Sequence, residues 1–239
     1  MKKITLVLAI ALFSAGTLVQ AQSLEKVLKN YHETMGQDVV LKAETSQSNG
    51  KMIQMGLEIP FKQYAARPSK FRVEATFQGM TLIQSFNGEK GWAINPFAGQ
   101  TEAQEMSEDE INDMKVQADF EGMLWNWEEK GHKVTLEENE EVEGTECFVV
   151  KTITKGGDEI VTYIDAENYI ALKSKMTATR QGQEVVTETI MSNYNEVDGY
   201  VYAGKVETRM GGQVVATIVI DEIVMNPELD QKIFESATK

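Results

Sequence analysis

The sequence of 239 residues is poor in the residue types on which most catalytic and metal-binding proteins depend. It contains one cysteine and two histidines. One cysteine excludes an intramolecular disulfide and every multi-cysteine metal site, and two histidines leave little for zinc binding or general-base catalysis. The motifs Gly-x-Ser-x-Gly, His-Glu-x-x-His and the glycine-rich phosphate loops are also absent. The sequence therefore predicts a protein that is not an enzyme and carries no cofactor.

Basic residues are scarce as well. Lys and Arg number 23 against 37 Asp and Glu, which gives a formal net charge of -14. Nucleic-acid binders need a basic face to neutralise phosphates, and adhesion to anionic lipid headgroups needs one too. Only four residues are proline, and 42% are hydrophobic, so the chain is long and apolar enough for a packed core. We expect a globular protein that does not bind nucleic acid.

Long apolar runs are missing except at the start of the chain. Lys2 and Lys3 precede the apolar run Ile4–Phe13, and small or neutral residues follow as far as Ala21. This three-part pattern is typical of a secretory signal peptide, with cleavage expected after Ala21. No cysteine follows that point, so we expect an exported, soluble, periplasmic product without a lipid anchor or a stable membrane anchor. Its charge would be -16, from 21 basic and 37 acidic residues.

The first half of the remaining chain reads as one helix followed by strands. Ser23 is a plausible helix N-cap, apolar residues recur at helical spacing from Leu24 to Met35, and Gly36 suits the residue that ends a helix. From Val39 to Asn95 the sequence predicts about five antiparallel strands. The turn signals that would join them are Asn49–Gly50, Gln78–Gly79 and Asn87–Gly88.

The second half begins with a pair of helices and continues as strands. Ser107 and Glu110 form a capping box, and a second helical face from Phe120 to Trp127 predicts another helix after a break near Asp119. About seven strands follow as far as Val224. The turns between them are expected at Gly144, Gly156–Gly157, Gln181–Gly182, Asp198–Gly199 and Gly211–Gly212, and a short helix is expected over Pro227–Phe234.

The order of elements predicts the fold class. Strands and helices do not alternate, which argues against a parallel sheet, and we detect no long linker or internal repeat. We therefore expect residues 22–239 to form one α+β domain that is mostly antiparallel β. A large sheet must cover one apolar face, and a few short helices are the only covers available. The prediction is an incomplete, half-open β-barrel with helices over its concave apolar face.

Several segments carry a resemblance to a known family. Residues 66–72 (ARPSKFR) and 87–97 (NGEKGWAINPF) resemble the Arg-Pro-x-x-Phe and Asn-Gly-x-x-x-Trp-x-x-Asn-Pro-Phe segments of LolA-like periplasmic lipoprotein carriers. Residues 118–122 (ADFEG) and 163–170 (YIDAENYI) resemble the longer outer-membrane lipoprotein-sorting proteins of that superfamily. A closing Asn-Pro-Glu-Leu-Asp-x-x-x-Phe at 226–234 adds to the likeness.

The resemblance implies a function. Proteins of this type hold the acyl chains of lipoproteins in an apolar hollow between sheet and helical lid and deliver them to the outer membrane. The partners it implies are lipoprotein acyl chains or another lipid, an inner-membrane release complex and an outer-membrane receptor, with the carrier itself a monomer. The alternative is an envelope sensor or regulatory domain of the same fold that binds a lipidated or misfolded ligand.

Arg67 is the residue to which the resemblance assigns control of the lid. It matches the family's strand arginine that hydrogen-bonds toward the lid helices and helps to set whether the cavity is open. Counting by twos along an unbroken strand places Arg67 on the same inward face as Phe71, Val73 and Phe77. A charge on that face needs a partner. The competing interpretation is an edge arginine that reaches solvent or pairs with a surface carboxylate.

The apolar residues of the matching segments are candidates for the acyl-chain site. In an open half-barrel the core and the pocket wall are the same surface, so each of them could be ordinary core instead. Cys147, in an apolar strand-like run, is expected to be a small buried hydrophobe rather than a reactive thiol. The acyl-binding candidates are Phe71, Val73, Phe77, Leu82, Trp92, Ile94, Phe97, Phe120, Met123, Leu124 and Trp127.

Overall fold

The computed structural model describes residues 23–180 and 183–235, and the predicted signal peptide lies outside them. The helices are α1 (Leu24–Thr34), α2 (Gln37–Lys42) and α3 (Glu108–Gln117), with two short 3-10 helices, η1 (Pro96–Ala98) and η2 (Gln231–Phe234). The strands are β1 (Thr45–Gln54), β2 (Leu57–Ala66), β3 (Lys70–Phe77), β4 (Met80–Phe86), β5 (Gly91–Asn95), β6 (Gln100–Glu105), β7 (Lys133–Leu136), β8 (Glu140–Val142), β9 (Thr145–Ile153), β10 (Glu159–Asp165), β11 (Ala171–Arg180), β12 (Gln183–Val197), β13 (Tyr200–Met210) and β14 (Gln213–Met225).

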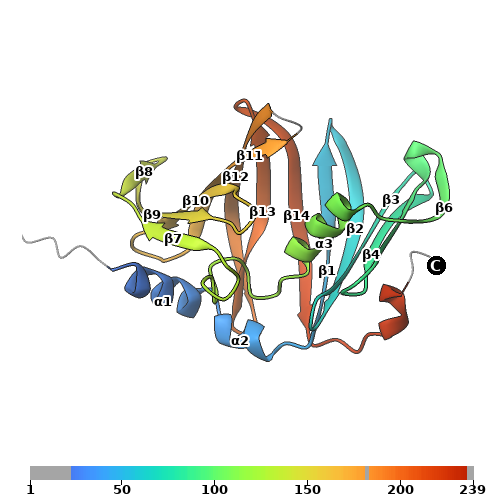
Figure 1. Ribbon diagram of the computed structural model, residues 1–239, viewed down its shortest axis with the longest axis horizontal. Coiled ribbons are helices and arrows are strands. Elements are labelled where there is room, and N and C mark those ends of the chain that lie inside the picture. Colours follow the sequence, from blue (N-terminus) through green and yellow to red (C-terminus); the bar gives the residue numbers. More distant parts are fainter. Residues whose placement is uncertain (1–22, 181–182, 236–239) are drawn as a thin grey trace, which may run out of the picture.

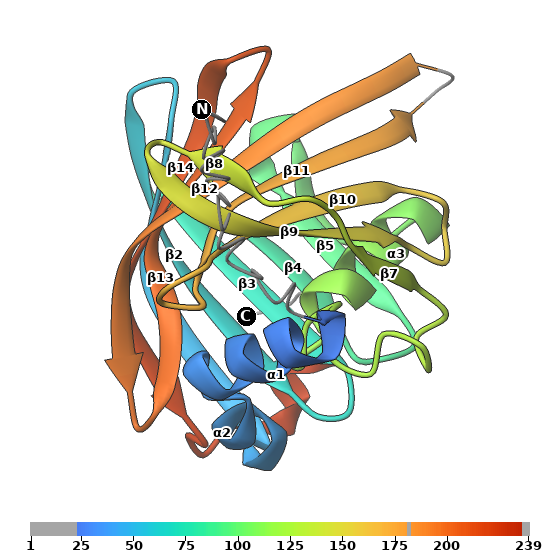
Figure 2. The ribbon, with the colours of Figure 1, turned by 90° about the vertical axis from the view of Figure 1, so that its left-hand side faces the viewer.

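These strands form one antiparallel sheet that does not close. Its order is β6-β5-β4-β3-β2-β1-β14-β13-β12-β11-β10-β9-β7, and β8 pairs with β9. Sequential strands are neighbours almost everywhere, and the β1–β14 pairing joins the two halves of the chain in the middle of the sheet. The sheet curls into a trough, with the helices on its concave side (Figures 1 and 2). The predicted fold class, an open α+β half-barrel, is confirmed.

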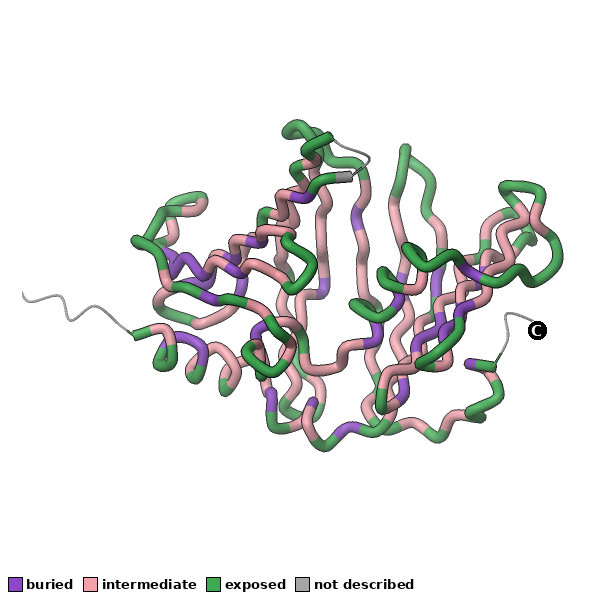
Figure 3. Tube along the Cα trace, in the orientation of Figure 1, coloured by how far each residue is buried: buried purple, intermediate pink, exposed green. Residues whose placement is uncertain are grey.

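Two separate cores lie on the concave side, one toward each edge of the sheet. In the first, Val27 and Leu28 of α1 pack with Phe148 and Val150 of β9. The second packs α3 against β3 and β4, and its buried members are Phe71, Phe86, Met106, Met114 and Ala118. Buried segments accordingly gather toward the two sides of the trough in Figure 3, with less buried strands between them. Between the two cores, the middle of the concave face is not filled by packed side chains.

Local signals account for the starts of the two longer helices. The Ser23 hydroxyl accepts a hydrogen bond from the Lys26 amide, which caps α1 as predicted. Ser107 and Glu110 form the predicted capping box of α3, since each side chain bonds to the backbone of the other residue. Both helix starts are therefore fixed by residues within one turn of the chain.

Three predicted elements differ from the structure. Residues 37–42 form α2 where strands were expected from Val39, because packing of the buried Val40 outweighs the β-propensity of this run. Asn49–Gly50 is no turn: it is an irregularity inside β1, and the hairpin turn comes at Met55–Gly56. The predicted second helix from Phe120 to Trp127 is a series of turns.

The second half of the chain also differs from the prediction in the number and length of its elements. Left-handed backbone at Gly122 and Asn126 interrupts any helix between Ala118 and Gly131, which explains the turns there. Eight strands rather than about seven follow, and the terminal helix shortens to the single 3-10 turn of η2. The other predicted turns that lie within the described residues occur where expected, whereas Gln181–Gly182 lies outside them.

Candidate functional site

The middle of the concave face holds a cavity of about 430 Å³ between the two cores. Its walls come from β1, β2, β3 and β11 to β14, and α1, α2 and the Phe120 segment close it from the other side. No Asp, Glu, Lys or Arg is found among the described residues that line it. The larger lining side chains are Tyr31, Met35, Val40, Tyr64, Phe71, Phe120, Met191, Tyr194, Tyr200, Tyr202, Val206, Ile220, Ile223 and Met225.

Strand register explains why these side chains converge. Residues that pair directly across neighbouring antiparallel strands point to the same face of the sheet. Ser46 pairs with Met225 and Ser48 with Ile223, and in β12 and β13 Met191 pairs with Val206. The irregularity at Asn49/Gly50 shifts the register by one, so that Gly50 pairs with Ile220. Apolar side chains of β14 therefore meet small side chains of β1, and this leaves room above the sheet.

Burial favours the neutral form of three tyrosines of the cavity. Burial raises the pKa of Tyr31 to about 12 and also raises the pKa values of Tyr194 and Tyr200. The Tyr194 hydroxyl donates to the carbonyl oxygen of Ala171, and the rings of Tyr200 and Tyr202 stack with centroids 5.9 Å apart. The cavity thus offers a lining of apolar and aromatic side chains, with hydroxyl and amide groups among them and no formal charge.

Arg67 ties the helical cover together. Its guanidinium donates to the carbonyl oxygens of Val40, at 2.9 Å, and Ala43, at 2.7 Å. It also donates to the Glu121 carboxylate at 3.1 Å and lies over the Phe120 ring, 5.2 Å from the centroid. One side chain therefore bonds α2, its following residue and the 118–131 segment. We call the Arg67–Glu121 ion pair with the two carbonyl bonds the Arg67 latch.

The structure corrects the predicted position of Arg67. It was expected to lie in a strand, on its inward face, but β2 ends at Ala66 and β3 begins at Lys70, so Arg67 is in the turn between them. Gln37 of α2 donates from Nε2 to the Glu121 carbonyl oxygen at 3.3 Å and reinforces the same contact. Arg67 therefore has hydrogen-bond and ion-pair partners, as a charge on the inward face would need, although it lies in a turn and not in a strand.

Only some of the predicted acyl-chain residues meet at the central cavity. Phe71 and Phe120 line it. Val73 packs against the core under α3. Leu82 pairs with Ala75 and shares the concave face, as do Phe71 and Phe77 by alternation. Phe77, at the end of β3, contacts the exposed Phe97 of η1, with ring centroids 6.4 Å apart.

Trp92 and Ile94 lie on the other side of the sheet. Trp92 pairs with Ser85, and Ile94 pairs with Ile83, so both alternate away from Phe86 and Phe71. The convex face at this position is covered by the C-terminal segment, where Ser85 and Arg72 both donate to the carbonyl oxygen of Ile233. These two candidates are therefore not part of the cavity, because the phase of β5 places them on the convex face.

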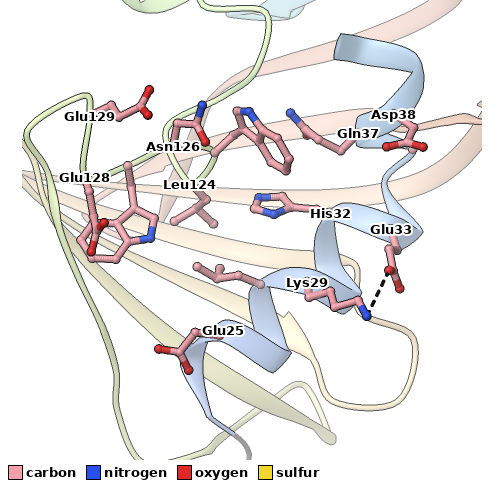
Figure 4. Close-up of a pocket in the computed structure, with 14 residues that line it drawn as sticks. Glu25, Lys29, His32, Glu33, Gln37, Asp38, Leu124, Asn126, Glu128 and Glu129 are labelled. Carbon is pink, nitrogen blue, oxygen red and sulfur yellow. Dashed lines mark ion pairs between the residues drawn. The ribbon is translucent and has the colours of Figure 1, made fainter. Parts of the chain in front are cut away.

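Met123, Leu124 and Trp127 belong to the first core instead. Leu124 is buried there, with Met123 and Trp127 packed against it. Leu124 and Trp127 also line a second cavity, of about 650 Å³, between α1 and residues 124–129 (Figure 4). They thus lie on the far side of α1 from the central cavity, whose lining includes Tyr31 of the same helix.

The second cavity is larger but strongly polar at its rim. The His32 ring meets Trp125 edge-on, with centroids 5.1 Å apart, and burial lowers the pKa of His32 to about 4. Lys29 pairs with Glu33 at 3.7 Å. The five carboxylates that line this cavity belong to Glu25, Glu33, Asp38, Glu128 and Glu129. An uncharged, apolar ligand is therefore better matched by the central cavity.

Cys147 and the possible metal ligands were also considered as functional groups within the described residues. Cys147 is fully buried in β9, and burial raises the pKa of its thiol, as suits a small core residue. Within residues 23–180 and 183–235, no group of three or more His, Cys, Asp or Glu side chains could hold a metal ion. None of the helices in the described part of the chain is long and apolar enough to cross a membrane.

Sequence reasoning missed the aromatic side of the cavity. Tyr31, Tyr194, Tyr200 and Tyr202 were not among the candidates, although they form much of the lining. The alternation Tyr200-x-Tyr202 in a predicted strand was an available signal, since residues two apart share a face. What no local pattern shows is that this face meets Tyr31 of α1, more than 160 residues earlier in the chain.

Comparison with known proteins places the chain in a family. A family model described as "Uncharacterized protein" matches residues 84–238, more than half of the chain. The chain belongs to this family. No curated protein matches the sequence.

Solved structures identify the fold. A LolA superfamily protein from Nitrosomonas europaea superimposes with a TM-score of 0.59 at 13% identity, over 90% of this chain and 98% of the other. A putative outer membrane lipoprotein-sorting protein domain from Vibrio parahaemolyticus gives 0.60 at 15% identity, over 88% and 96%. A DUF1329 family protein from Desulfovibrio piger gives 0.60 at 14%, over 87% and 96%. The protein has a LolA-like fold.

Proposed function

We propose that this protein is a soluble periplasmic carrier. It holds acyl chains of a lipoprotein, or of another amphiphile, in the central cavity and delivers them to the outer membrane. The observation that carries the proposal is the uncharged lining of that cavity on the concave face of a LolA-like fold. The signal-peptide pattern of residues 1–21 supports export, and the likeness to the lipoprotein-sorting protein domain from Vibrio parahaemolyticus supports a lipoprotein ligand. No chemical reaction is part of this proposal.

The dimensions and energetics suit such a ligand. A volume of about 430 Å³ falls in the range of ~300–1,000 Å³ found for ligand pockets. Moving one methylene group out of water contributes about 0.8 kcal/mol, so eight methylenes would contribute roughly 6 kcal/mol. A carboxylate or ammonium group would find no counter-ion among the described lining residues. The cavity therefore favours a hydrocarbon chain, with its polar head outside.

The Arg67 latch would control whether the helical cover opens to admit a ligand. Ligand entry between α2 and the 118–131 segment requires these parts to separate, and Arg67 bonds both of them. Because Arg67 and Glu121 each retain about a quarter of their side-chain exposure, water can replace these bonds at moderate cost. In this proposal Arg67 controls the lid, while Phe71 and Phe120 contact the chain.

Uptake of a fluorescent fatty acid tests the proposal. Ile223 faces the cavity, and its neighbour Val224 is exposed. We expect Ile223→Asp to lower probe affinity about tenfold or more, because it places a carboxylate in the apolar lining, whereas Val224→Asp should leave affinity unchanged. Ala203→Phe, which fills the cavity without adding charge, should lower affinity as well. Circular dichroism confirms folding of each variant.

Two results would contradict the proposal. The first is a wild-type protein that takes up no probe and, by native mass spectrometry of material purified from its own periplasm, carries no lipid. The second is uptake that Ile223→Asp and Ala203→Phe both leave intact. Transfer of a bound probe to acceptor vesicles then separates a carrier from a protein that only retains its ligand.

A further inference from the structure

The hairpins at one end of the trough form a common edge. In an antiparallel sheet, connections alternate between the two ends of the strands. The β1–β2, β3–β4, β5–β6 and β13–β14 connections consequently fall at the same end, which Figure 1 shows along its upper edge for β1, β2, β6 and β14. We call residues 54–57, 77–80, 96–99 and 210–215 the hairpin rim.

The hairpin rim carries most of the exposed large hydrophobic side chains in the described part of the chain. Seven of the ten lie in it, and Met55 at its most prominent tip is 94% exposed. Two tips are joined by the contact between Phe77 and Phe97. Core packing does not explain this group of side chains, because they are exposed and point away from the core. The seven are Met55, Leu57, Met80, Phe97, Met210, Val214 and Val215.

The hairpin rim also lacks charge. One quarter of the whole sequence is charged, and its net charge is -14. Yet residues 52–57, 75–88, 91–101 and 210–220, which contain the four tips and the strand ends beside them, include no Asp, Glu, Lys or Arg. The four tips are thus uncharged, whereas the β11–β12 hairpin at the same end has Arg180 and Glu184, and Lys51 and Glu58 pair below the β1–β2 tip.

We propose that the hairpin rim docks on the surface of a lipid bilayer. The apolar side chains sit on separate tips, one to three to a tip, rather than in one contiguous patch like the core of a protein–protein interface. A fluid lipid interface accepts several short apolar insertions at once and needs no matching shape. Uncharged tips also approach a zwitterionic surface without repulsion, whereas an anionic surface would repel the acidic body.

This inference extends the proposed carrier function and rests on it. Val206 and Ile220 of the cavity lie on β13 and β14, the two strands that lead directly to the tip at Gly211–Gly212. Docking through this edge would therefore bring the strands that line the cavity end-on to the membrane from which an acyl chain leaves or into which it goes. Attachment would be reversible, because each tip offers only one to three apolar side chains.

Vesicle flotation tests the inference with ligand-free, full-length protein. We expect wild-type protein to float with phosphatidylcholine vesicles and to float less when phosphatidylglycerol is added at low salt. Met55→Asp combined with Met210→Asp should lower the bound fraction about tenfold or more. The control combines Val116→Asp and Val224→Asp, which change two exposed valines outside the hairpin rim, and should stay within about twofold of wild type.

The outcomes separate this inference from the carrier proposal. Fatty-acid uptake measured without vesicles depends on the cavity alone, so the rim variant should take up the probe as wild type does. Wild-type protein that takes up the probe but ignores phosphatidylcholine vesicles would overturn membrane docking and assign the rim to a protein surface. Flotation that needs anionic lipid, or that the rim variant retains, would overturn it too.

Discussion

The guanidinium of Arg67 lies 3.1 Å from the carboxylate of Glu121, although 54 residues separate them in the sequence. Arg67 follows β2, and Glu121 belongs to the turns after α3, so the pair joins the sheet to its cover. The same guanidinium bonds the last carbonyl groups of α2. Disruption of this pair should therefore affect both the stability of the protein and access to the central cavity.

Glu121→Gln should loosen the latch without removing its hydrogen-bond acceptor. We expect a loss of about 1 kcal/mol in the free energy of unfolding, as for a partly buried ion pair, and faster uptake of a fluorescent fatty acid. Arg67→Leu should cost more, about 2 kcal/mol, because the Val40 and Ala43 carbonyl groups also lose their donor. Urea unfolding and stopped-flow uptake measure the two effects.

The matched control for this prediction is Glu58→Gln. Glu58 pairs with Lys51 at 2.9 Å, but both side chains are more exposed than those of the latch, and they lie on the β1–β2 hairpin. This variant should change the free energy of unfolding by less than about 0.5 kcal/mol and leave uptake unchanged. Equal uptake rates in Arg67→Leu and wild-type protein would contradict a lid role for Arg67.

His32 should make part of the stability dependent on pH. Burial beside Trp125 lowers the pKa of His32, in α1, to about 4 from an ordinary value near 6.5. Above pH ~6.5 the ring is neutral whether the chain is folded or not, so His32 does not change the free energy of unfolding in that range. Between pH ~6.5 and 4 the unfolded chain binds a proton that the folded protein excludes, and stability falls as the pH falls.

Comparison with His32→Phe isolates this effect. The variant keeps a ring against Trp125 but cannot titrate, while the surrounding carboxylates titrate equally in both proteins. From pH 7.5 to 5 the wild type should lose about 1 kcal/mol more than the variant, after a discount for partial exposure of the ring. Urea unfolding across this range measures the difference. Parallel pH profiles would mean that His32 is not buried in the folded protein.

Local signals in the sequence predicted much of the fold. The Ser23 and Ser107 caps each act within one turn of chain, and both helices begin where predicted. The antiparallel strands and most of the turns were also predicted from residues that are close to one another in the sequence. The failures are elements set by distant partners: Asp119 and Lys130 pair at 2.6 Å and help to hold the 118–131 segment in turns, where its apolar spacing alone predicted a helix.

The candidate site was harder to predict than the fold. Whether a strand residue lines the cavity depends on the phase of its strand, and a shift of one residue exchanges the two faces. Trp92 and Phe71 come from equally convincing segments, yet they lie on opposite faces because of the pairing of β3, β4 and β5. The aromatic lining from β12 and β13 depends on the β1–β14 pairing, which no adjacent residues encode.

Phe234 should anchor the C-terminal segment to the convex face. It is fully buried at the end of η2, and the neighbouring Ile233 carbonyl accepts hydrogen bonds from Arg72 and Ser85. Phe234→Ala should cost about 3 kcal/mol or more in the free energy of unfolding, because it leaves a cavity and weakens the cover over Arg72. Fatty-acid affinity should stay near that of the wild type, since the central cavity is on the other face.

Gly50 should be essential to the register that shapes the central cavity. A Cβ at this position would lie 2.1 Å from the Val219 carbonyl oxygen, so any side chain would force β1 and β14 apart. Gly50→Ala should cost about 1–3 kcal/mol and lower fatty-acid affinity, because Gly50 pairs with the cavity residue Ile220. The control is Gly156→Ala, where the added Cβ would meet only the Thr154 hydroxyl at 3.7 Å. A Gly50→Ala protein as stable as this control would show that β1 and β14 can separate without cost.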